Sequence, residues 1–533
     1  KMKVSPYFKS FLQVVLQFSD DEMNKQKLSD WVSVCENIVL NSSSRKLLKY
    51  CEFTTEFLNT KTLRNSKSVK WFTDFSSFNF KHEDGVPFIS FNTPVDLSCS
   101  NRNGEFHILN TTGKYWISTN SWEGKSGLVN WLSRGISNDS VYAILSDYYI
   151  DVRESQFKAD SVIFYNKLLF SDPILGVFSN KALSGSASEN FPVFKSYKKD
   201  IVINNILPDV DYKGGYTLRG RDFIADGRGD ASARMVIKKN GKEVLVASST
   251  RFSINKNIIY SKSASIKIYF DEDSICHPSL EFTYDQSDRK LKLYRDMKGV
   301  SGAPIYNSYH QLTIDAELLE WNIDEDNIFM GSLPVTSISS VDFESVASYN
   351  EGYYHSLRGI DKVNPLMLVN RFVKRSEKTE FSSAEFAHFS GYPLEQIEPY
   401  LMNLANKGFL FYNIATNRVM VQEKLHNYIN ARLKIGDYDV IRFQSKVSSG
   451  TGNGMVVNSA LNLITKDLNI NGVSSVSLSD SQKVYIQPYN GHVSVKKNRD
   501  FDFSGRISAG RGRFVLYGQD FNFKYNDFKI DLK

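Results

Sequence analysis

The segment SIKIYF (residues 265–270) is followed by LEFTYD (280–285) and KLKLYRD (290–296), and apolar and polar side chains largely alternate in all three. A period of two is typical of a β-strand, because successive side chains point to opposite faces of the sheet. Short polar segments separate the three runs, and such segments favour turns. We therefore predict short β-strands joined by turns in this part of the chain.

The same pattern extends in both directions along the sequence. It covers residues 67–345, where the Ser-rich joint LSGSASEN marks a possible sub-boundary near 183–192, and it returns in residues 435–533. The 37 Phe and 28 Tyr residues favour strands, because aromatic rings pack well on a pleated surface. Many short strands at a spacing of about 8–12 residues predict a mainly β chain of stacked strands, as in a β-roll, a β-solenoid or a jellyroll-like fold.

One sequence motif occurs in both β regions. GYTLRGRDF (215–223) and RFVLYGQDF (513–521) share an aromatic residue, a Leu, a Gly and a final Asp-Phe in register. The shared glycine is expected at a bulge or a turn. We therefore expect both β regions to use one kind of structural unit.

Residues 1–66 have a helical pattern. In the second of three segments Trp31, Val34 and Ile38 recur at helical spacing. The candidate helix starts are Ser5 with Pro6, Asp20 with Asp21, and Ser43 with Ser44. We predict a three-helix bundle, which usually serves as a scaffold or as a surface for partners.

Residues 362–434 form a helical island between the two β regions. Asn364 and Pro365 are expected to start its first helix, and Ser382 with Glu385 can form a capping box at the second. A third helix and a hairpin, FLFYNIATNRVMV (409–421), follow. This order predicts a winged-helix-like module, which we expect to interrupt one continuous β architecture.

The third helix of the island tests whether the module binds DNA. It is expected to be kinked or shortened by Pro399. Its predicted buried residues are Leu394, Ile397, Leu401 and Leu404, and its predicted outward residues are Glu395, Gln396, Glu398 and Asn403. Carboxylates facing phosphates have the wrong sign for DNA affinity, which depends on Lys and Arg contacts. We therefore predict a structural or protein-contact module and no nucleic-acid partner.

The balanced charge argues against a nucleic-acid binder, and the cysteine spacing argues against zinc and redox sites. The chain carries 65 Lys and Arg against 59 Asp and Glu, for a net charge of +6, without a long basic run. No apolar run approaches the roughly 18 residues of a membrane-spanning helix, so we predict no transmembrane segment in this fragment. None of Cys35, Cys51, Cys99 and Cys276 belongs to a C-x-x-C pair, and we predict no cofactor.

GVSGAP (299–304) is the sharpest enzymatic hint in the sequence. It resembles the G-x-S-G-x-P stretch around the nucleophile of trypsin-like proteases, which would make Ser301 the nucleophile. Such a serine needs a histidine base held by an acid. His82, His107 and His277 precede it, but none has the T-A-x-H context of that family. Ser301 is therefore the candidate catalytic residue, and a glycine-bounded turn explains the motif as well.

Other motifs offer less. The acidic clusters DEDSICH (271–277) and DEDN (324–327) lack the glycine spacing of a calcium loop, and they read as solvated loop ends. The candidate metal ligands in them are Asp271, Asp273, Asp324 and Asp326. GKS (124–126) lacks the spacing of a phosphate loop, and GTGNG (450–454) lacks that of a dinucleotide fingerprint. RGD (228–230) is explained by ordinary turn chemistry.

Several longer stretches resemble a family of very large, uncharacterised cell-envelope proteins from Bacteroidota. They are SGLVNWLSRGI (126–136), KADSVIFYN (158–166), SLRGIDKVNP (356–365), LMNLANKGFLFY (401–412), SLSDSQKVYIQP (477–488) and residues 496–532. The resemblance implies a fragment of a longer, exported protein whose last β domain continues beyond residue 533, but no activity. KADSVIFYN and its neighbours also resemble rungs of the β-jellyrolls that carry lipopolysaccharide across the periplasm.

These observations predict a non-enzymatic scaffold or binding protein of the cell envelope, in the periplasm or at the outer-membrane surface. Its partners would be envelope proteins or glycolipid, bound through the faces and edges of its sheets. A periplasmic lipid or glycolipid conduit of the β-jellyroll type is the alternative, and it requires an open apolar groove. A trypsin-like serine hydrolase that uses Ser301 is the third hypothesis.

Overall fold

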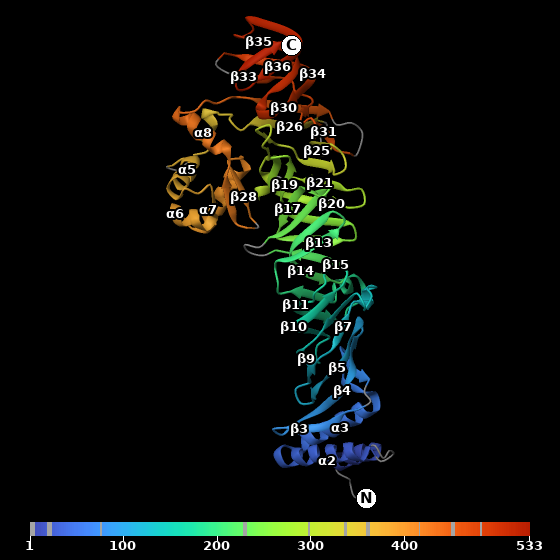
Figure 1. Ribbon diagram of the computed structural model, residues 1–533. Helices are drawn as coiled ribbons and strands as arrows, with labels where there is room; N and C mark the ends of the chain where they lie inside the picture. Colours follow the sequence, from blue (N-terminus) through green and yellow to red (C-terminus); the bar gives the residue numbers. More distant parts are fainter. Residues whose placement is uncertain are drawn as a thin grey trace. The chain divides into compact units, whose positions relative to one another are not determined.

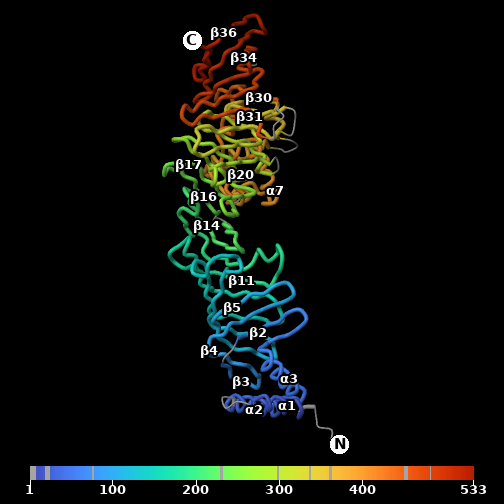
Figure 2. The backbone as a smooth tube through the Cα atoms, turned by 90° about the vertical axis from the view of Figure 1, so that its right-hand side faces the viewer, coloured from blue at the N-terminus to red at the C-terminus, as the bar shows by residue number. Residues whose placement is uncertain are grey.

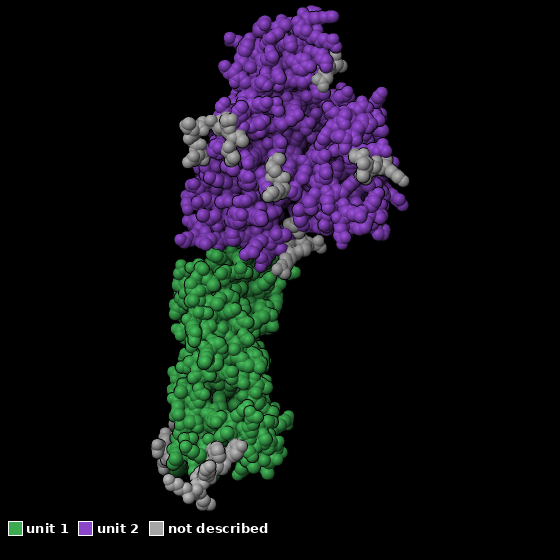
Figure 3. Space-filling view, turned by 180° about the vertical axis from the view of Figure 1, so that it is seen from behind, with its two compact units in different colours: residues 1–199, 215–224 green, residues 200–214, 225–533 purple. Residues whose placement is uncertain are grey.

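The protein is mainly β, with a large antiparallel sheet and an N-terminal helical region, as the sequence predicts (Figure 1). The computed structural model describes residues 6–18, 24–74, 77–227, 232–296, 299–334, 338–358, 363–414, 416–448, 454–479 and 482–532. It contains two compact units, one made of Lys1–Lys199 with Gly215–Ile224 and the other of Asp200–Gly214 with Ala225–Lys533 (Figure 3). The RGD motif, most of GTGNG and the candidate caps Ser5, Asp20 and Asp21 lie outside the described residues.

Three helices open the first unit, and they confirm the predicted helical region. They are α1 (Pro6–Phe18), α2 (Asn24–Asn41) and α3 (Ser44–Thr60), and α2 lies against strand β3 (Asn79–Glu83; Figures 1 and 2). Trp31 is fully buried among them, where its ring stacks on that of Tyr50 at 6.1 Å and its Nε1 donates to Thr54 Oγ1 at 3.0 Å. Ser43 stands at the start of α3, as predicted, but its side chain makes no capping hydrogen bond.

The strands of the first unit pair only antiparallel in the described segments. One run of neighbours is β1–β2–β4–β5–β6–β9 with β3 beside β4, and the other is β5–β7–β8–β10–β11–β12–β14, where β14 is Val210–Arg219. The elements are β1 (Thr62–Asn65), β2 (Lys70–Asp74), β3 (Asn79–Glu83), β4 (Val86–Asn101), β5 (Gly104–Trp116), β6 (Ser121–Lys125), β7 (Leu128–Asn130), η1 (Leu132–Arg134), β8 (Val141–Ile144), β9 (Asp147–Asp151), β10 (Gln156–Asn166), β11 (Ile174–Lys181), η2 (Gly185–Asn190) and β12 (Val193–Ser196). Large aromatic side chains fill the interior, with Trp71, Trp122 and Trp131 fully buried.

The second unit continues with antiparallel strands. SIKIYF lies in β19 and LEFTYD in β20, and these two strands pair with each other. The elements up to the helical island are β13 (Ile201–Leu207), β14 (Val210–Arg219), β15 (Asp222–Asp226), β16 (Ala233–Lys239), β17 (Lys242–Ser249), β18 (Arg251–Asn255), β19 (Ile258–Phe270), β20 (Asp273–Asp285), β21 (Lys290–Tyr294), η3 (Gly299–Gly302), β22 (Ile305–Asn307), β23 (Leu312–Ile314), β24 (Leu318–Asn322), β25 (Asn327–Ser332) and β26 (Ile338–Ser345). Residues of β14 and β15 are divided between the two units.

Strands that follow the island return to the same sheet. β31 pairs with β25 and β30 pairs with β26, so the island is inserted between strands that are neighbours in space. The strands after it are β30 (Arg442–Ser448), β31 (Val456–Asn462), β32 (Leu468–Ile470), β33 (Val476–Ser479), β34 (Val484–Val495), β35 (Phe501–Ala509), β36 (Phe514–Lys524) and β37 (Lys529–Leu532), with the short η4 (Lys497–Arg499).

The short helix α4 (Glu351–Ser356) precedes the island, whose described residues contain four helices and a separate three-stranded sheet with strand order β27–β29–β28. Asn364 caps α5, and Ser382 with Glu385 forms the predicted capping box of α6. The elements are α4 (Glu351–Ser356), α5 (Pro365–Ser376), β27 (Glu380–Ser382), α6 (Ser383–Ser390), α7 (Leu394–Asn406), β28 (Leu410–Asn413), β29 (Arg418–Val421) and α8 (Glu423–Leu433).

Pro399 does not shorten α7, and Leu394 is not buried in it. The helix runs on through Pro399 to Asn406, so the proline does not end it, although it removes one backbone donor. Leu394 is 39% exposed, because it is the first residue of the helix and lies outside the cluster that buries Ile397 and Leu401.

The shared sequence motif adopts two different conformations. In the first copy Gly220 has a φ of +56° and makes a turn between β14 and β15, where a Cβ would lie 1.7 Å from the carbonyl oxygen of Glu189. In the second copy Gly518 lies inside the continuous strand β36, at a shift in its register with β35. The predicted turn or bulge is present in each copy, but the units are not the same.

No helix in the described part of the chain is both long and apolar enough to cross a membrane.

Candidate functional site

Ser301 lies in the short helix η3, and its hydroxyl is part of a chain of seryl hydroxyls. Its Oγ lies 2.9 Å from Oγ of Ser279 on β20, which lies 2.8 Å from Oγ of Ser263 on β19. On β17 and β19, Ser249 and Ser261 are joined in the same way at 2.9 Å. No histidine nitrogen is hydrogen-bonded to Ser301 within the described ranges. The chain of hydroxyls joins neighbouring strands where their backbones are irregular.

His277 is close to Ser301 in sequence and fold, but both of its ring nitrogens are occupied. Nε2 lies 2.7 Å from the carbonyl oxygen of Ala303, and Nδ1 accepts from the backbone N–H of Ser279 at 3.0 Å. This pattern fixes the neutral tautomer with its proton on Nε2. Burial lowers the pKa of His277 to about 3, so the ring stays neutral.

The same carbonyl accepts a second donor. Arg295 is buried, its Nη1 donates to the Ala303 oxygen at 3.1 Å, and its Nη2 pairs with Asp315. His277 and Arg295 thus hold the GVSGAP turn against β20 and β21. A structural role explains both residues through contacts that are present.

The four acidic candidates are spread over separate contacts. Asp271 pairs with Lys466, while Asp273 accepts from Ser308 Oγ at 2.7 Å. Arg289 Nε lies 3.0 Å from Asp324, and Lys239 Nζ lies 3.7 Å from Asp326. In the described ranges, no three His, Cys, Asp or Glu side chains are grouped so that they could hold a metal ion.

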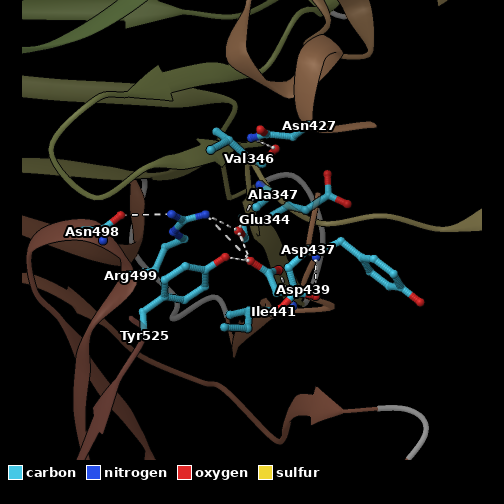
Figure 4. A network of polar contacts seen from close by, with 12 residues as sticks. Glu344, Val346, Ala347, Asn427, Asp437, Asp439, Ile441, Asn498, Arg499 and Tyr525 are labelled. Carbon is cyan, nitrogen blue, oxygen red and sulfur yellow. Dashed lines mark hydrogen bonds and ion pairs between the residues drawn. The ribbon is translucent and has the colours of Figure 1, made fainter. Parts of the chain in front are cut away.

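A buried polar cluster fastens the last strands to the rest of the second unit (Figure 4). Asp439 Oδ2 accepts from Ser345 Oγ at 2.6 Å and from the Tyr525 hydroxyl at 2.7 Å. The guanidinium of Arg499 lies 3.7 Å from the Tyr525 ring centre, and its Nη1 lies 3.7 Å from Asp439 Oδ2. These side chains come from β26, from the segment after α8, from η4 and from the turn after β36. The cluster therefore positions β36.

An apolar row crosses the last sheet and ends uncovered on β36. Val476, Ile486, Ile507 and Leu516 are register partners on β33, β34, β35 and β36. Their exposed fractions are 0%, 0%, 6% and 61%. A second row, Val493, Phe503, Phe521 and Leu532, runs from buried residues to a leucine that is 65% exposed. Both rows thus present a large apolar side chain at their outer end.

The backbone of β36 is open beside the first row. β37 pairs with β36 only from Phe521 to Lys524, and among the described strands none pairs with the outer edge of residues 514–518. Phe514 and Tyr517 on this segment are also largely exposed. An unpaired strand edge with apolar side chains is a template for another strand.

The sequence predicts the strand β36, but it does not predict that side chains on this strand are exposed. RFVLYGQDF contains an apolar run at residues 514–517, which is consistent with a strand, but this pattern does not distinguish the exposed Leu516 from the buried Ile507. The sequence supports only the general prediction that partners bind at strand edges. It named no residue.

Comparisons of the chain with protein-family models, with curated proteins and with solved structures find no match. Function is therefore inferred from geometry.

Proposed function

We propose that this protein is a non-catalytic binding protein of the cell envelope that captures an extended polypeptide segment at the outer edge of β36. The observation that carries the proposal is the apolar row from Val476 to Leu516, which is buried on three strands and exposed on the fourth. An added strand would continue the row. Fully burying a leucine side chain contributes about 1.5–3 kcal/mol.

The edge defines the chemistry of the segment it would bind. Main-chain hydrogen bonds to alternate residues of 514–518 supply affinity for any extended chain, and side-chain contacts supply selectivity. The bound segment would place an apolar residue opposite Leu516 and others at alternate positions, because Phe514 and Leu516 share one face. We expect the bound partner to be an envelope protein.

The helical island supports contact with protein. Its element order, α5–β27–α6–α7–β28–β29, is that of a winged helix, and we propose that it is a structural or protein-contact module. α7 packs against η3, which occupies one side of the helix that would read a DNA groove. Lys424 on α8 bonds Glu344 on β26 at 2.6 Å and ties the module to the sheet.

The two alternatives have less support. A lipid or glycolipid conduit needs a continuous apolar groove. The interior instead holds tightly packed rings, as where Phe164 stacks on Phe194 with centroids 4.1 Å apart. A hydrolase needs a base at Ser301, whose described partner is Ser279. Location in the envelope rests on the family resemblance of the sequence.

Peptide binding tests the proposal. The probe is a soluble peptide, KKTLTLTLTKK, with a second peptide of the same composition in scrambled order as the comparison. We expect the alternating peptide to bind, and Leu516→Lys to weaken it by at least about tenfold, because a charge replaces the central apolar contact. The matched control is Leu168→Lys, since Leu168 is 72% exposed on the first unit.

The result that would overturn the proposal is equally specific. Either no saturable binding of the alternating peptide, or binding that Leu516→Lys and Leu168→Lys affect equally, would show that the β36 edge does not capture strands. Thermal unfolding of each variant confirms that both proteins are folded. Leu516 is exposed, so neither substitution disturbs the core.

A further inference from the structure

The outer face of the first unit contains an open hollow of about 970 Å³. It lies over β4, β5, β6, β9 and β10. Its volume is within the range of about 300–1,000 Å³ that small-molecule sites occupy. The hollow belongs to one unit and is separate from the edge of β36.

Two irregular strands border the hollow. The register of β4 with β5 shifts between Phe91 and Val95, and that of β10 with β11 shifts between Ala159 and Val162. A bulge bends its strand and redirects the side chains beside it, and bulges are frequent next to binding sites. Asn92 and Asp160 lie at these two irregularities and line the hollow.

The backbone beneath the hollow is closely packed from inside. Tyr148 lies so close under Gly124 that a Cβ there would come within 2.2 Å of the ring. The Tyr148 hydroxyl lies 2.7 Å from Thr111 Oγ1 and accepts from Trp122 Nε1 at 3.3 Å. Burial raises the pKa of Tyr148 to about 12, so the hydroxyl stays protonated. This packing supports the strands beneath the hollow, whose outward side chains line it.

Two rows of side chains cross the hollow. Register partners place Glu123 between Lys114 and Tyr149 in one row, and Lys125 beside Asp147 in the next. Lys158 and Asp160 complete the charged lining, which then has three cations and three anions. A balanced lining selects against ligands of high net charge.

Some of these charges already have partners. Lys114 bonds Glu83 at 2.8 Å, and Lys158 pairs with Asp160 at 3.3 Å. For Glu123, Lys125 and Asp147 no ion pair is found within the described segments. Two carboxylates that accept and one ammonium that donates are therefore available to a ligand.

We propose that the hollow binds a neutral saccharide. Hydroxyl groups both donate and accept, so one sugar can serve the carboxylates of Glu123 and Asp147 together with the ammonium of Lys125. Tyr149 is 56% exposed, and its ring offers an apolar surface for the C–H face of a pyranose. A lipid acyl chain would leave these polar groups without partners, and a polyanion would be repelled by the carboxylates of Glu123 and Asp147.

Calorimetric titration of the whole chain with defined probes tests this site. The probes are maltotetraose and chitotetraose as neutral sugars, with tetragalacturonate and tetralysine as the charged comparisons, each taken to about 10 mM. We expect saturable binding of at least one neutral sugar. Tyr149→Ala should weaken it by about tenfold or more, because the ring surface on which the sugar would stack is removed.

Two further variants make the test specific. Lys125→Gln with Asp147→Asn removes both charges but leaves polar side chains and should also weaken sugar binding, whereas Tyr392→Ala, at a tyrosine that is likewise 56% exposed, should have no effect. The proposal is overturned if neither neutral sugar binds, if Tyr149→Ala leaves binding unchanged, or if a charged probe binds more tightly than both sugars. None of these results depends on the edge of β36.

Discussion

The Oγ of Ser301 lies 2.9 Å from the Oγ of Ser279, and this pair is the outer end of a chain of seryl hydroxyls that crosses β20 to β19. The serine with the most protease-like sequence context thus has a hydroxyl for its partner. Nucleophilic serine needs a general base that removes its proton. The described contacts of Ser301 instead suit a hydrogen bond that holds a turn.

Ser301 should therefore not react as an activated nucleophile. We predict no labelling of the folded chain by a fluorophosphonate probe, measured by mass spectrometry of the peptide that contains residue 301. Ser301→Ala should only lower the free energy of unfolding, by about 0.5–1.5 kcal/mol for one lost hydrogen bond. Labelling that Ser301→Ala abolishes would instead revive the hydrolase hypothesis.

Acid should destabilise the fold through His277. Its pKa is lowered by burial from 6.5 to about 3 in the folded chain, so the unfolded chain takes up the proton first as the pH falls. The stability that neutral His277 contributes above pH 6.5 is then lost toward pH 3, by up to about 1.4 kcal/mol per pH unit.

Urea unfolding between about pH 7 and about pH 4 measures this dependence. His277→Gln should flatten the pH slope, because the amide can still donate to Ala303 but does not titrate in this range. His82→Gln, at an exposed histidine, is the control and should leave the slope unchanged. Equal slopes for wild type and His277→Gln would contradict the assignment.

The cluster around Asp439 should matter far more than an ion pair on the surface. Asp439→Asn removes the charge that faces buried Arg499, and breaking such a pair costs about 3–5 kcal/mol. Asp531→Asn, which breaks the surface pairs with Lys524 and Lys529, should cost much less. Equal losses of unfolding free energy for the two variants would show that the cluster does not fasten β36.

Cys99, which is buried, and Cys276, which is half-buried, should resist alkylation in the folded chain. Burial raises the pKa of Cys99 to about 12 and that of Cys276 to about 11, which leaves little reactive thiolate near pH 8. Mass spectrometry after iodoacetamide treatment should find these thiols unmodified without urea and modified in urea. Rapid modification of Cys276 without urea would contradict its placement on β20.

Features that depend on neighbours in the chain could be predicted from the sequence, whereas features that depend on distant residues could not. SIKIYF and the capping box of Ser382 with Glu385 were predicted correctly, because strand alternation and helix caps depend on neighbours in the chain. The prediction that Leu394 is buried was wrong, because burial at this position depends on what surrounds the start of α7. The motif around Gly220 and Gly518 folds in two ways, since the paired strands differ.

Such sequence patterns do not predict the two proposed binding surfaces. Leu516 and Ile507 are register partners on neighbouring strands, and Leu516 is the exposed one because no described strand pairs with the outer edge of β36 at that position. The hollow depends on bulges in β4 and β10 and on residues as distant in sequence as Asn92 and Asp160. Both features arise from long-range register, which a single sequence does not specify.

Amide hydrogen exchange tests the account most directly. With KKTLTLTLTKK bound, alternate amides within residues 514–518 of β36 should gain protection, because an added strand accepts hydrogen bonds from them. Leu516→Lys should show no such gain under the same conditions. Peptide binding that leaves exchange at 514–518 unchanged would contradict strand capture at this edge.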